Sequence, residues 1–302
     1  MKNMNIMIVG VGGQGTLLTS RIIGKTALNS GLDVKMSEVH GMAQRGGSVV
    51  TFVRFGVKVN QPVIEEGMAD VLISFEKLEA FIDAIYNPLR TDCTLDAKGM
   101  GAISDGGLYM LVSQATKAYE FFTDTKLPQE KNIQIYNEIV AEKENIVLVG
   151  MPGSGKSTVA SVLAKKLGRT VYDTDALIVE KAGVPISEIF EEHGEEYFRD
   201  LESEVVREIS QKSGVIISTG GGAVLRELNV RRLKRNGRIY FLDRPLDDIR
   251  PTRDRPLASD FQALKRRYDE RYAIYCSSCD CKITRFDSIA KTAEEVIGDF
   301  FR

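Results

Sequence analysis

The chain has no tryptophan and only two histidines, His40 and His193, among its 302 residues. Zinc sites usually take several His or Cys ligands, so histidine cannot supply such a cluster here. Cysteine is also sparse, and three of the four cysteines form the run Cys276-Ser-Ser-Cys279-Asp-Cys281. No second cysteine pair elsewhere completes a tetrahedral site, and we therefore expect neither a metal nor a redox centre in this run.

A strong charge of either sign is missing as well, because the formal net charge is −2. Such a balance creates no global attraction for nucleic acid or anionic membranes. The richest basic cluster, at 231–238, contains no aromatic residue and is typical of a solvated helix face. No apolar run approaches the roughly 20 residues that cross a bilayer. With few cysteines and no secretory signal, the sequence predicts a cytoplasmic protein without nucleic-acid or membrane partners.

The clearest positive feature is the octapeptide Gly150-Met-Pro-Gly-Ser-Gly-Lys156-Ser157, which matches the phosphate-binding pattern G-x-x-x-x-G-K-[ST]. The apolar run 146–149 before it predicts a strand, and the apolar spacing of 158–167 after it predicts a helix. In such a P-loop, backbone N–H groups wrap the phosphates, the lysine reaches the β and γ phosphates, and the serine hydroxyl binds Mg²⁺. The sequence therefore predicts that Mg²⁺ and ATP are bound by Gly150, Gly153, Ser154, Gly155, Lys156, Ser157 and Thr158.

The start of the chain predicts a strand at 5–9, a glycine-rich turn at 10–15 and a helix at 16–30, followed by strands at 49–55 and 70–74. This order is that of a partial, Rossmann-like α/β region. The turn also fits G-x-G-x-x-G, which leaves dinucleotide binding as a weakly supported alternative.

Within this region, the turn Gly12-Gly-Gln-Gly15 and the stretch from His40 to Gly47 resemble the small subunit of indolepyruvate:ferredoxin oxidoreductase. That subunit is a member of the gamma family of 2-oxoacid oxidoreductases. The resemblance covers about 1–79, and it implies a partner large subunit that carries thiamine diphosphate and iron–sulfur clusters.

The next part of the chain, about 81–127, resembles the C-terminal end of shikimate dehydrogenase through Asn87-Pro88 and the run from Gly106 to Gln114. In that family the Asn-Pro segment ends a strand of the NADP domain, and the glutamine at the position of Gln114 helps hold shikimate. The catalytic Lys and Asp of the family would lie upstream and have no counterpart here. We therefore expect no dehydrogenase activity.

Beyond the P-loop, a short predicted strand ends in Asp173-Thr-Asp175. On an extended segment residues i and i+2 face the same side, so both carboxylates would point into one cleft, toward Mg²⁺ and a substrate hydroxyl. A helix N-cap is the open alternative. Further on, Arg199 and Glu202 predict a carboxylate-binding fork held by an acid, with a plain surface ion pair as the alternative.

Two later segments complete the pattern. The run Gly220-Gly221-Gly222 follows a buried-type strand and predicts close backbone approach, with N–H groups available to a ligand. The polar segment 251–257 has the composition of a lid, and an arginine delivered by a lid can neutralise charge on the transferring phosphoryl group.

Taken in this order, the P-loop, Asp-x-Asp, Phe-Arg-x-x-Glu, triple glycine, Arg-Pro-Leu and Arg-x-x-x-Tyr patterns resemble shikimate kinase across 145–302. The resemblance implies that Asp175 binds the shikimate hydroxyl and accepts its proton, and that Arg199 and Arg271 clamp the carboxylate. The implied catalytic residues are Asp175, Lys156 and Arg255. The implied substrate-binding residues are Asp175, Arg199, Gly220, Gly221, Gly222 and Arg271. Ser157 and Asp173 would hold the metal, and the nucleotide-side arginine stays open among Arg244, Arg250 and Arg253.

The predicted fold class is α/β: a P-loop kinase with a parallel sheet flanked by helices, preceded by the partial Rossmann-like region. The expected divisions are 1–79, 80–130, a linker helix at 131–144, and a kinase domain at 145–302 that we expect to be monomeric. The expected reaction is phosphorylation of the shikimate 3-hydroxyl by ATP. Alternatives are a P-loop kinase for another small carboxylated polyol, and a subunit or assembly module of an oxidoreductase complex, acting through the N-terminal part of a fusion.

Overall fold

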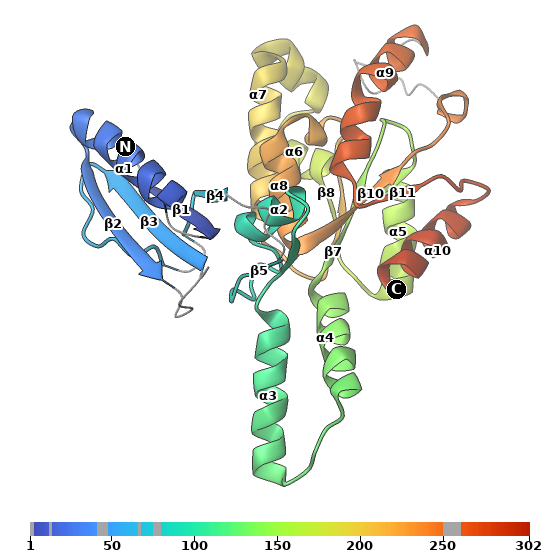
Figure 1. Cartoon of the computed structure of the whole chain (residues 1–302). Helices are drawn as coiled ribbons and strands as arrows, with labels where there is room; N and C mark the ends of the chain where they lie inside the picture. The colour runs from blue at the N-terminus through green and yellow to red at the C-terminus, as the bar shows by residue number, and fades with distance from the viewer. Residues whose placement is uncertain (1–2, 12–13, 41–47, 66–67, 75–79, 250–260) are drawn as a thin grey trace. The chain divides into compact units, whose positions relative to one another are not determined.

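A computed structural model of the chain describes residues 3–11, 14–40, 48–65, 68–74, 80–249 and 261–302. The chain divides into two compact units, Met1–Phe122 and Thr123–Arg302, whose elements are labelled in Figure 1. In the described residues, no helix combines the length and the apolar character that a membrane span requires.

The first unit begins with a four-stranded mixed sheet of order β2-β3-β1-β4. Its elements are β1 (Met4–Val11), α1 (Gln14–Asn29), β2 (Asp33–His40), β3 (Ser48–Gly56) and β4 (Val71–Ser74). β3 is antiparallel to both β1 and β2, while β4 is parallel to β1. The predicted strands at 49–55 and 70–74 correspond to β3 and β4, whereas β2 was not predicted. Because β3 is antiparallel to β1, the sheet is mixed and not parallel throughout as in a Rossmann fold.

One face of this sheet packs on α1. Ile6, Ile8 and Val53 form its small core, with Ile23 of α1 packed against them. The opposite side of α1 leaves Leu18 62% exposed, so this helix carries apolar residues on both faces.

The rest of the first unit is a two-stranded parallel sheet with two helices. β5 (Ala80–Ile82) pairs with β6 (Ile103–Asp105), α2 (Asp92–Gly99) connects them, and α3 (Leu108–Thr123) follows. Thr91 caps α2, because its side chain accepts a hydrogen bond from the backbone N–H of Thr94. At the end of α3, Phe121 and Phe122 are 84% and 82% exposed.

The second unit starts with α4 (Gln129–Lys143), so a helix is present close to the predicted range 131–144. Its five-stranded sheet has the order β11-β10-β7-β9-β8, and every neighbouring pair is parallel. The strands are β7 (Asn145–Val149), β8 (Val171–Asp173), β9 (Ile216–Ser218), β10 (Gly237–Leu242) and β11 (Cys281–Ile283). The helices are α5 (Lys156–Leu167), α6 (Thr174–Ala182), α7 (Ile186–Ile209), α8 (Glu227–Asn236), α9 (Phe261–Ser278) and α10 (Ile289–Phe300).

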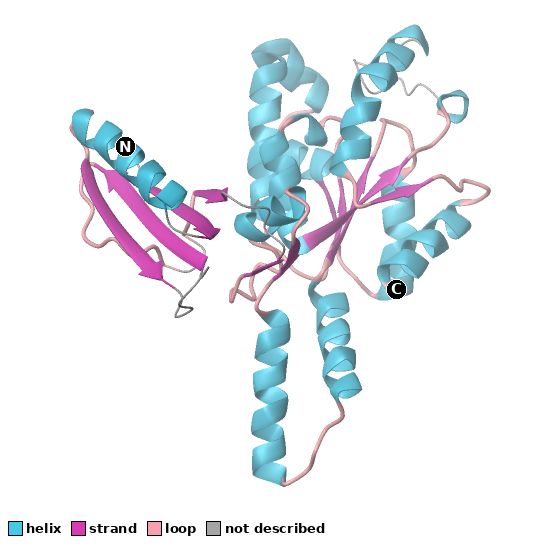
Figure 2. Cartoon of the chain, viewed as in Figure 1, coloured by secondary structure: helices cyan, strands magenta, loops and turns pink. Residues whose placement is uncertain are grey.

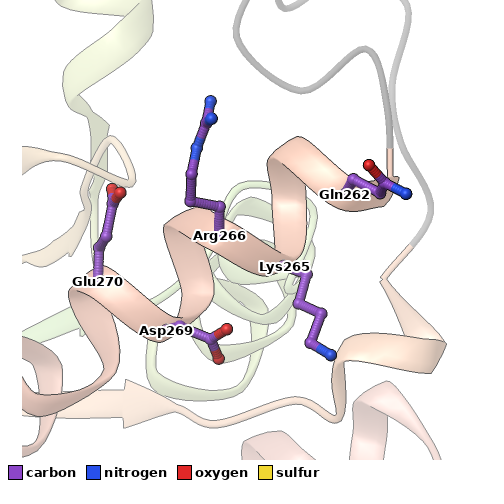
Figure 3. Close-up of a pocket in the computed structure, with 5 residues that line it drawn as sticks. All are labelled: Gln262, Lys265, Arg266, Asp269 and Glu270. Atoms are coloured by element: carbon purple, nitrogen blue, oxygen red, sulfur yellow. The ribbon is translucent and has the colours of Figure 1, made fainter.

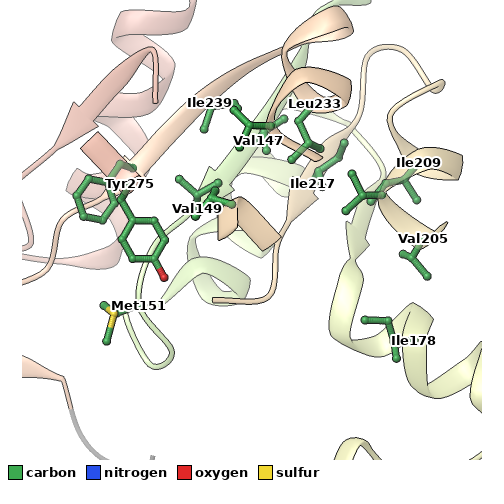
Figure 4. Packing of buried hydrophobic residues seen from close by; sticks show 14 of the residues in the cluster. Val147, Val149, Met151, Ile178, Val205, Ile209, Ile217, Leu233, Ile239 and Tyr275 are labelled. Carbon is green, nitrogen blue, oxygen red and sulfur yellow. The ribbon is translucent and has the colours of Figure 1, made fainter. Parts of the chain in front are cut away.

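Two apolar layers cover the two faces of this sheet. Because side chains alternate along a strand, Ile146 and Leu148 of β7 point to one face, into a core shared with α5 and α10. Val147 and Val149 point to the other face, into a core shared with α6, α7, α8 and α9, which Figure 4 shows around Tyr275. β7 is buried on both faces, which explains its continuous apolar sequence. Figure 2 shows the strands of this unit between helices on either side.

A parallel sheet gathers the carboxyl ends of its strands at one edge, where ligands of open α/β sheets bind. Here the P-loop follows β7, Asp173 ends β8, the triple glycine follows β9, and Arg244 follows β10. These four segments therefore meet at the same edge of one sheet, while Arg199 and Arg271 come from the helices α7 and α9.

Candidate active site

The P-loop joins β7 to α5 with the geometry that its sequence predicts. Gly153 and Gly155 have φ of +82° and +96°, which side-chain-bearing residues rarely adopt. Lys156 opens α5, is only 6% exposed, and its Nζ donates hydrogen bonds to the carbonyls of Gly150 at 2.8 Å and Met151 at 2.9 Å. The side chain of Lys156 therefore lies along the P-loop, with its ammonium group inside the loop that is expected to bind phosphate.

Ser157 lies next to the end of β8. Its Oγ donates a hydrogen bond to Asp173 Oδ2 at 2.8 Å, and Ser218 Oγ, at the end of β9, lies 3.3 Å away. Hydroxyl and carboxylate oxygens are the hard ligands that Mg²⁺ prefers, together with phosphate oxygens and water. The oxygens of Ser157 and Asp173 therefore fit the predicted metal. Ser218 was missed at the sequence level, because nothing in a buried strand marks its last hydroxyl.

The Asp-x-Asp segment corrects one step of the sequence argument. Asp173 is the N-cap of α6, since its Oδ1 accepts hydrogen bonds from the backbone N–H of Asp175 at 3.1 Å and Ala176 at 3.3 Å. Asp175 therefore stands in the first turn of a helix and not two residues along a strand. The N-cap alternative is therefore confirmed for Asp173, and the strand ends there because its side chain caps α6. The carboxylate of Asp175 nevertheless reaches the triple glycine, because its Oδ1 lies 2.5 Å from where a Cβ on Gly220 would be.

Arg199 belongs to a buried ion pair, so the surface-pair alternative is wrong. Its Nη1 donates to Glu202 Oε2 at 2.7 Å, and its Nη2 donates to Glu195 Oε1 at 3.0 Å. Burial lowers the pKa of the Arg199 guanidinium, but the two glutamates outweigh this effect and its pKa lies above the ordinary value. The cation is held firmly charged in a site that solvent scarcely reaches.

Glu202 is itself almost fully buried at 1% exposure. Burial raises its pKa, the charge of Arg199 opposes the rise, and the nearby carboxylate of Asp175 adds to it. Its second oxygen, Oε1, has no hydrogen-bond partner in the described part of the chain and lies 2.8 Å from the Cβ position of Gly220. An unpaired buried carboxylate oxygen is uncommon, and this one lies beside Asp175.

Each glycine of the triple run is required by close packing. A Cβ would meet Asp175 at Gly220, Pro152 of the P-loop at Gly221, and the guanidinium of Arg199 at Gly222. The expectation of available N–H groups is wrong for Gly220, whose N–H donates to Thr174 Oγ1 at 2.7 Å. The buried hydroxyl of Thr174 accepts this hydrogen bond, so the N–H of Gly220 is not available to a ligand.

Arg271 approaches the same turn from α9. Its Nη1 donates to the carbonyl oxygen of Gly221 at 3.2 Å, and the hydroxyl of Tyr275 donates to the same oxygen. Tyr275 stacks on Phe241 with ring centres 4.9 Å apart, and burial raises the pKa of its hydroxyl to about 12. Arg199 and Arg271 therefore both lie against the triple glycine, one from α7 and one from α9.

Of the predicted arginines at 244–255, only Arg244 is described. Its Nη1 lies 3.8 Å from the Cβ position of Gly155 in the P-loop. Arg250, Arg253 and Arg255 lie outside the described residues.

A pocket of ≈ 590 Å³ lies along α9 (Figure 3). It is lined by Gln262, Lys265, Arg266, Asp269 and Glu270. Because none of these residues belongs to the predicted site, the pocket is not its centre.

The cysteine run ends α9 and enters β11. The Sγ of Cys279 lies 3.4 Å from the carbonyl of Cys276. Burial raises the pKa of the Cys279 thiol, and it raises that of Cys281 to about 11, so both stay protonated near neutral pH. Over the described residues, no group of three or more His, Cys, Asp or Glu side chains is placed to hold a metal ion.

Comparisons with known proteins match the second unit to one family. The profile of the shikimate kinase family matches residues 152–300. A curated shikimate kinase of Clostridium botulinum (strain Eklund 17B / Type B) is 41% identical over 161 residues, covering 52% of this chain and 94% of the relative. Another, from the strain Alaska E43 / Type E3, is 40% identical over 158 residues, covering 51% of this chain and 95% of the relative.

A solved structure agrees with these sequence matches. The shikimate kinase from Acinetobacter baumannii in complex with shikimate is similar with a TM-score of 0.51 and 31% identity. The match covers 53% of this chain and 94% of that chain. For the N-terminal part, the profile described as pyruvate ferredoxin/flavodoxin oxidoreductase matches residues 5–138.

Proposed function

The chain belongs to the shikimate kinase family, and we propose that its second unit transfers the γ-phosphoryl group of ATP to the 3-hydroxyl of shikimate. The products are shikimate 3-phosphate and ADP, which places the protein in the biosynthesis of chorismate and the aromatic amino acids. Curated shikimate kinases about 40% identical to this chain and a neighbour solved with shikimate support this activity.

One observation in the structure carries the proposal. Arg199 and Arg271, both less than 10% exposed, lie against Gly222 and Gly221, and Gly221 in turn packs on Pro152 of the P-loop. Two desolvated guanidinium groups beside a phosphate-binding loop suit a small substrate that carries a carboxylate. The pair favours shikimate over an uncharged polyol.

The acceptor hydroxyl is assigned to Asp175. Its carboxylate lies next to Gly220 and to the buried Glu202, on the side of the triple glycine that faces α6. A carboxylate there can orient the hydroxyl and accept its proton as the phosphoryl group arrives. Glu202 orients Arg199 through the hydrogen bond between Nη1 and Oε2.

The nucleotide phosphates are assigned to the P-loop residues and to Lys156, whose Nζ would exchange its bonds to the Gly150 and Met151 carbonyls for phosphate oxygens. Ser157 and Asp173 would hold Mg²⁺, which neutralises phosphate charge when bound. We also assign Arg255 to the transferring phosphoryl group, on its Arg-Pro-Leu sequence alone. Positioning and charge neutralisation then supply most of the rate.

The test is a coupled assay of ADP release by the full chain with Mg·ATP. Shikimate should stimulate ADP release, while gluconate, a carboxylated polyol of different shape, should not. Stimulation by gluconate alone would assign the site to another polyol. ATP binding without stimulation by shikimate would refute the proposed reaction.

A second function is favoured by the match of residues 5–138 to the oxidoreductase profile. We propose that 1–79 derives from a small subunit of the indolepyruvate:ferredoxin type and serves as a binding or assembly module for a large subunit. The segment 80–130 is proposed to be a shikimate dehydrogenase fragment, joined by the helix at 131–144 to the kinase at 145–302. Affinity purification of the tagged chain from its own cells tests the module: a large oxidoreductase subunit should be recovered with it, and recovery of the chain alone counts against it.

The remaining properties follow as proposals from composition. The kinase unit is proposed to act as a monomer. The small net charge supports the absence of nucleic-acid and membrane partners. A cytoplasmic location is supported by the four free cysteines and by the use of ATP.

A further inference from the structure

Thr174 is the middle residue of the Asp-x-Asp segment and is completely buried, with 0% exposure. It opens α6 directly after β8, between Asp173 and Asp175. Its hydroxyl oxygen accepts a hydrogen bond from the backbone N–H of Gly220 at 2.7 Å, across a sequence separation of 46 residues. This bond therefore joins the start of α6 to the first residue of the triple glycine.

The same bond continues the ladder between β8 and β9 after β8 has ended. In that ladder the N–H of Ile216 donates to the carbonyl of Thr170 at 2.9 Å, and the bonds of a parallel pair are evenly spaced. A step of four residues along both segments leads from this pair to Gly220 and Thr174. Because the backbone of Thr174 is already helical, its side-chain hydroxyl accepts the bond that its carbonyl would accept in a longer strand.

Gly220 lies between two carboxylates of the site. A Cβ on Gly220 would stand 2.5 Å from Asp175 Oδ1 and 2.8 Å from Glu202 Oε1. The position of the Gly220 backbone therefore decides how closely the carboxylate of Asp175 approaches the triple glycine.

Thr219 fixes the other side of the same turn. Its backbone N–H and its Oγ1 both donate to the carbonyl of Leu148, at 3.1 Å and 3.0 Å. Leu148 belongs to β7, the strand that leads into the P-loop. The triple-glycine turn is thus tied on one side to the strand that carries the P-loop and on the other side to the helix that carries Asp175.

We propose that Thr174 is a positioning residue for phosphoryl transfer: its hydroxyl fixes the first turn of α6 against Gly220, and thereby the carboxylate of Asp175 relative to the P-loop. Transfer requires the acceptor hydroxyl, its base and the phosphate in one geometry, and a displacement of about 1 Å can cost about 10²-fold in rate. Thr174 is fully buried, so it acts through Asp175 and not on a bound substrate. The inference rests on the reaction proposed above.

Steady-state kinetics of the full chain, with Mg·ATP and shikimate each varied in turn, tests this role. Thr174→Val keeps the branched shape but leaves the buried N–H of Gly220 without an acceptor. It should lower kcat about 10–100-fold and leave the KM for both substrates near the wild-type values. Thr174→Ala, which removes the same acceptor with a smaller side chain, should show the same loss. Thr174→Ser should restore most of kcat, because a serine hydroxyl can accept the same bond.

Thr292→Val is the matched control for lost stability. Thr292 is equally buried in α10, where its Oγ1 donates to the carbonyls of Arg285 at 2.8 Å and Ser288 at 3.1 Å. This variant should be less stable in a urea titration, and its kcat at saturating Mg·ATP should equal that of the wild type.

Hydrogen exchange of the Gly220 amide gives a readout that does not depend on turnover. The amide should exchange much faster in Thr174→Val than in the wild type, Thr174→Ser or Thr292→Val. An unchanged exchange rate in Thr174→Val would overturn the inference.

Three kinetic results would overturn it as well: wild-type kcat in folded Thr174→Val or Thr174→Ala, a raised KM for shikimate with unchanged kcat, or equal losses of kcat in Thr174→Val and Thr292→Val. Failure of the proposed reaction is distinguishable from these results. A wild-type chain without shikimate-stimulated ADP release refutes the reaction and, with it, any role of Thr174 in it.

Discussion

Arg199 and Glu202 form an ion pair with 2.7 Å between Nη1 and Oε2, and their side chains are only 9% and 1% exposed. Removing one partner of a buried pair leaves an uncompensated charge, so each residue depends on the other. The second oxygen of Glu202 faces the triple glycine beside Asp175. The pair therefore connects the side of the site that we propose to bind the carboxylate with the side that we propose to bind the hydroxyl.

Arg199→Lys should raise the KM for shikimate about 10–100-fold, because an ammonium group cannot reproduce the bidentate fork of a guanidinium. The effect on ATP binding should be small. Steady-state kinetics with varied shikimate measures both. Arg207→Lys is the matched control, since Arg207 lies on the same helix with 52% of its side chain exposed. An unchanged KM in a folded Arg199→Lys variant would remove Arg199 from the clamp.

Asp175→Asn should lower kcat about 10²–10⁴-fold, the usual contribution of a positioned general base. The affinity for Mg·ATP should stay near that of the wild type, because the P-loop is untouched. Initial rates and a separate ATP titration check the two parts of the prediction. Asp269→Asn, a change on the exposed face of α9, is the control. Near-normal turnover in Asp175→Asn contradicts the proposed proton acceptor.

Gly222→Ala should impair shikimate binding more than ATP binding, because the new Cβ would overlap the guanidinium of Arg199. Overpacking of this kind costs about 1–3 kcal/mol, so a KM increase of about tenfold is expected. The comparison is Gly298→Ala in α10, where a Cβ meets nothing within 4 Å. That control should leave kinetics unchanged and stabilise the helix by up to about 1 kcal/mol. Similar kinetics for the two variants would refute the close packing on Arg199.

Tyr275→Phe should reduce the decrease in the free energy of unfolding that occurs as the pH rises above 10. The hydroxyl of Tyr275 has its pKa raised to about 12 in the folded chain from 10.0, so the folded state holds its proton more tightly than the unfolded state. Stability from this group is complete below pH 10.0 and is lost as the pH rises toward 12. At pH 11 the loss is about 1 kcal/mol. Urea titrations at pH 9 and pH 11 should show a smaller decrease for the variant, and equal decreases would contradict the raised pKa.

Local sequence was sufficient for the P-loop. A strand, three glycines, a lysine and a helix follow one another within one stretch of chain, so their geometry depends on neighbours in sequence. The same holds for the continuous apolar run of β7, which predicts a strand buried on both faces. One local prediction was wrong: the two-residue spacing of a strand does not apply to Asp173 and Asp175. Asp173 caps α6, so Asp175 lies in the first turn of that helix.

Contacts between distant segments were decided by the tertiary structure alone. The sequence by itself determined the kinase unit's motifs, their order and the family they resemble. The packing of the sheet decided that Arg199 is buried, that Thr174 uses the N–H of Gly220, and that Arg244 meets Gly155. The physical reason is that burial and hydrogen-bond partners depend on which strands become neighbours. No single motif in the sequence specifies the strand order β11-β10-β7-β9-β8.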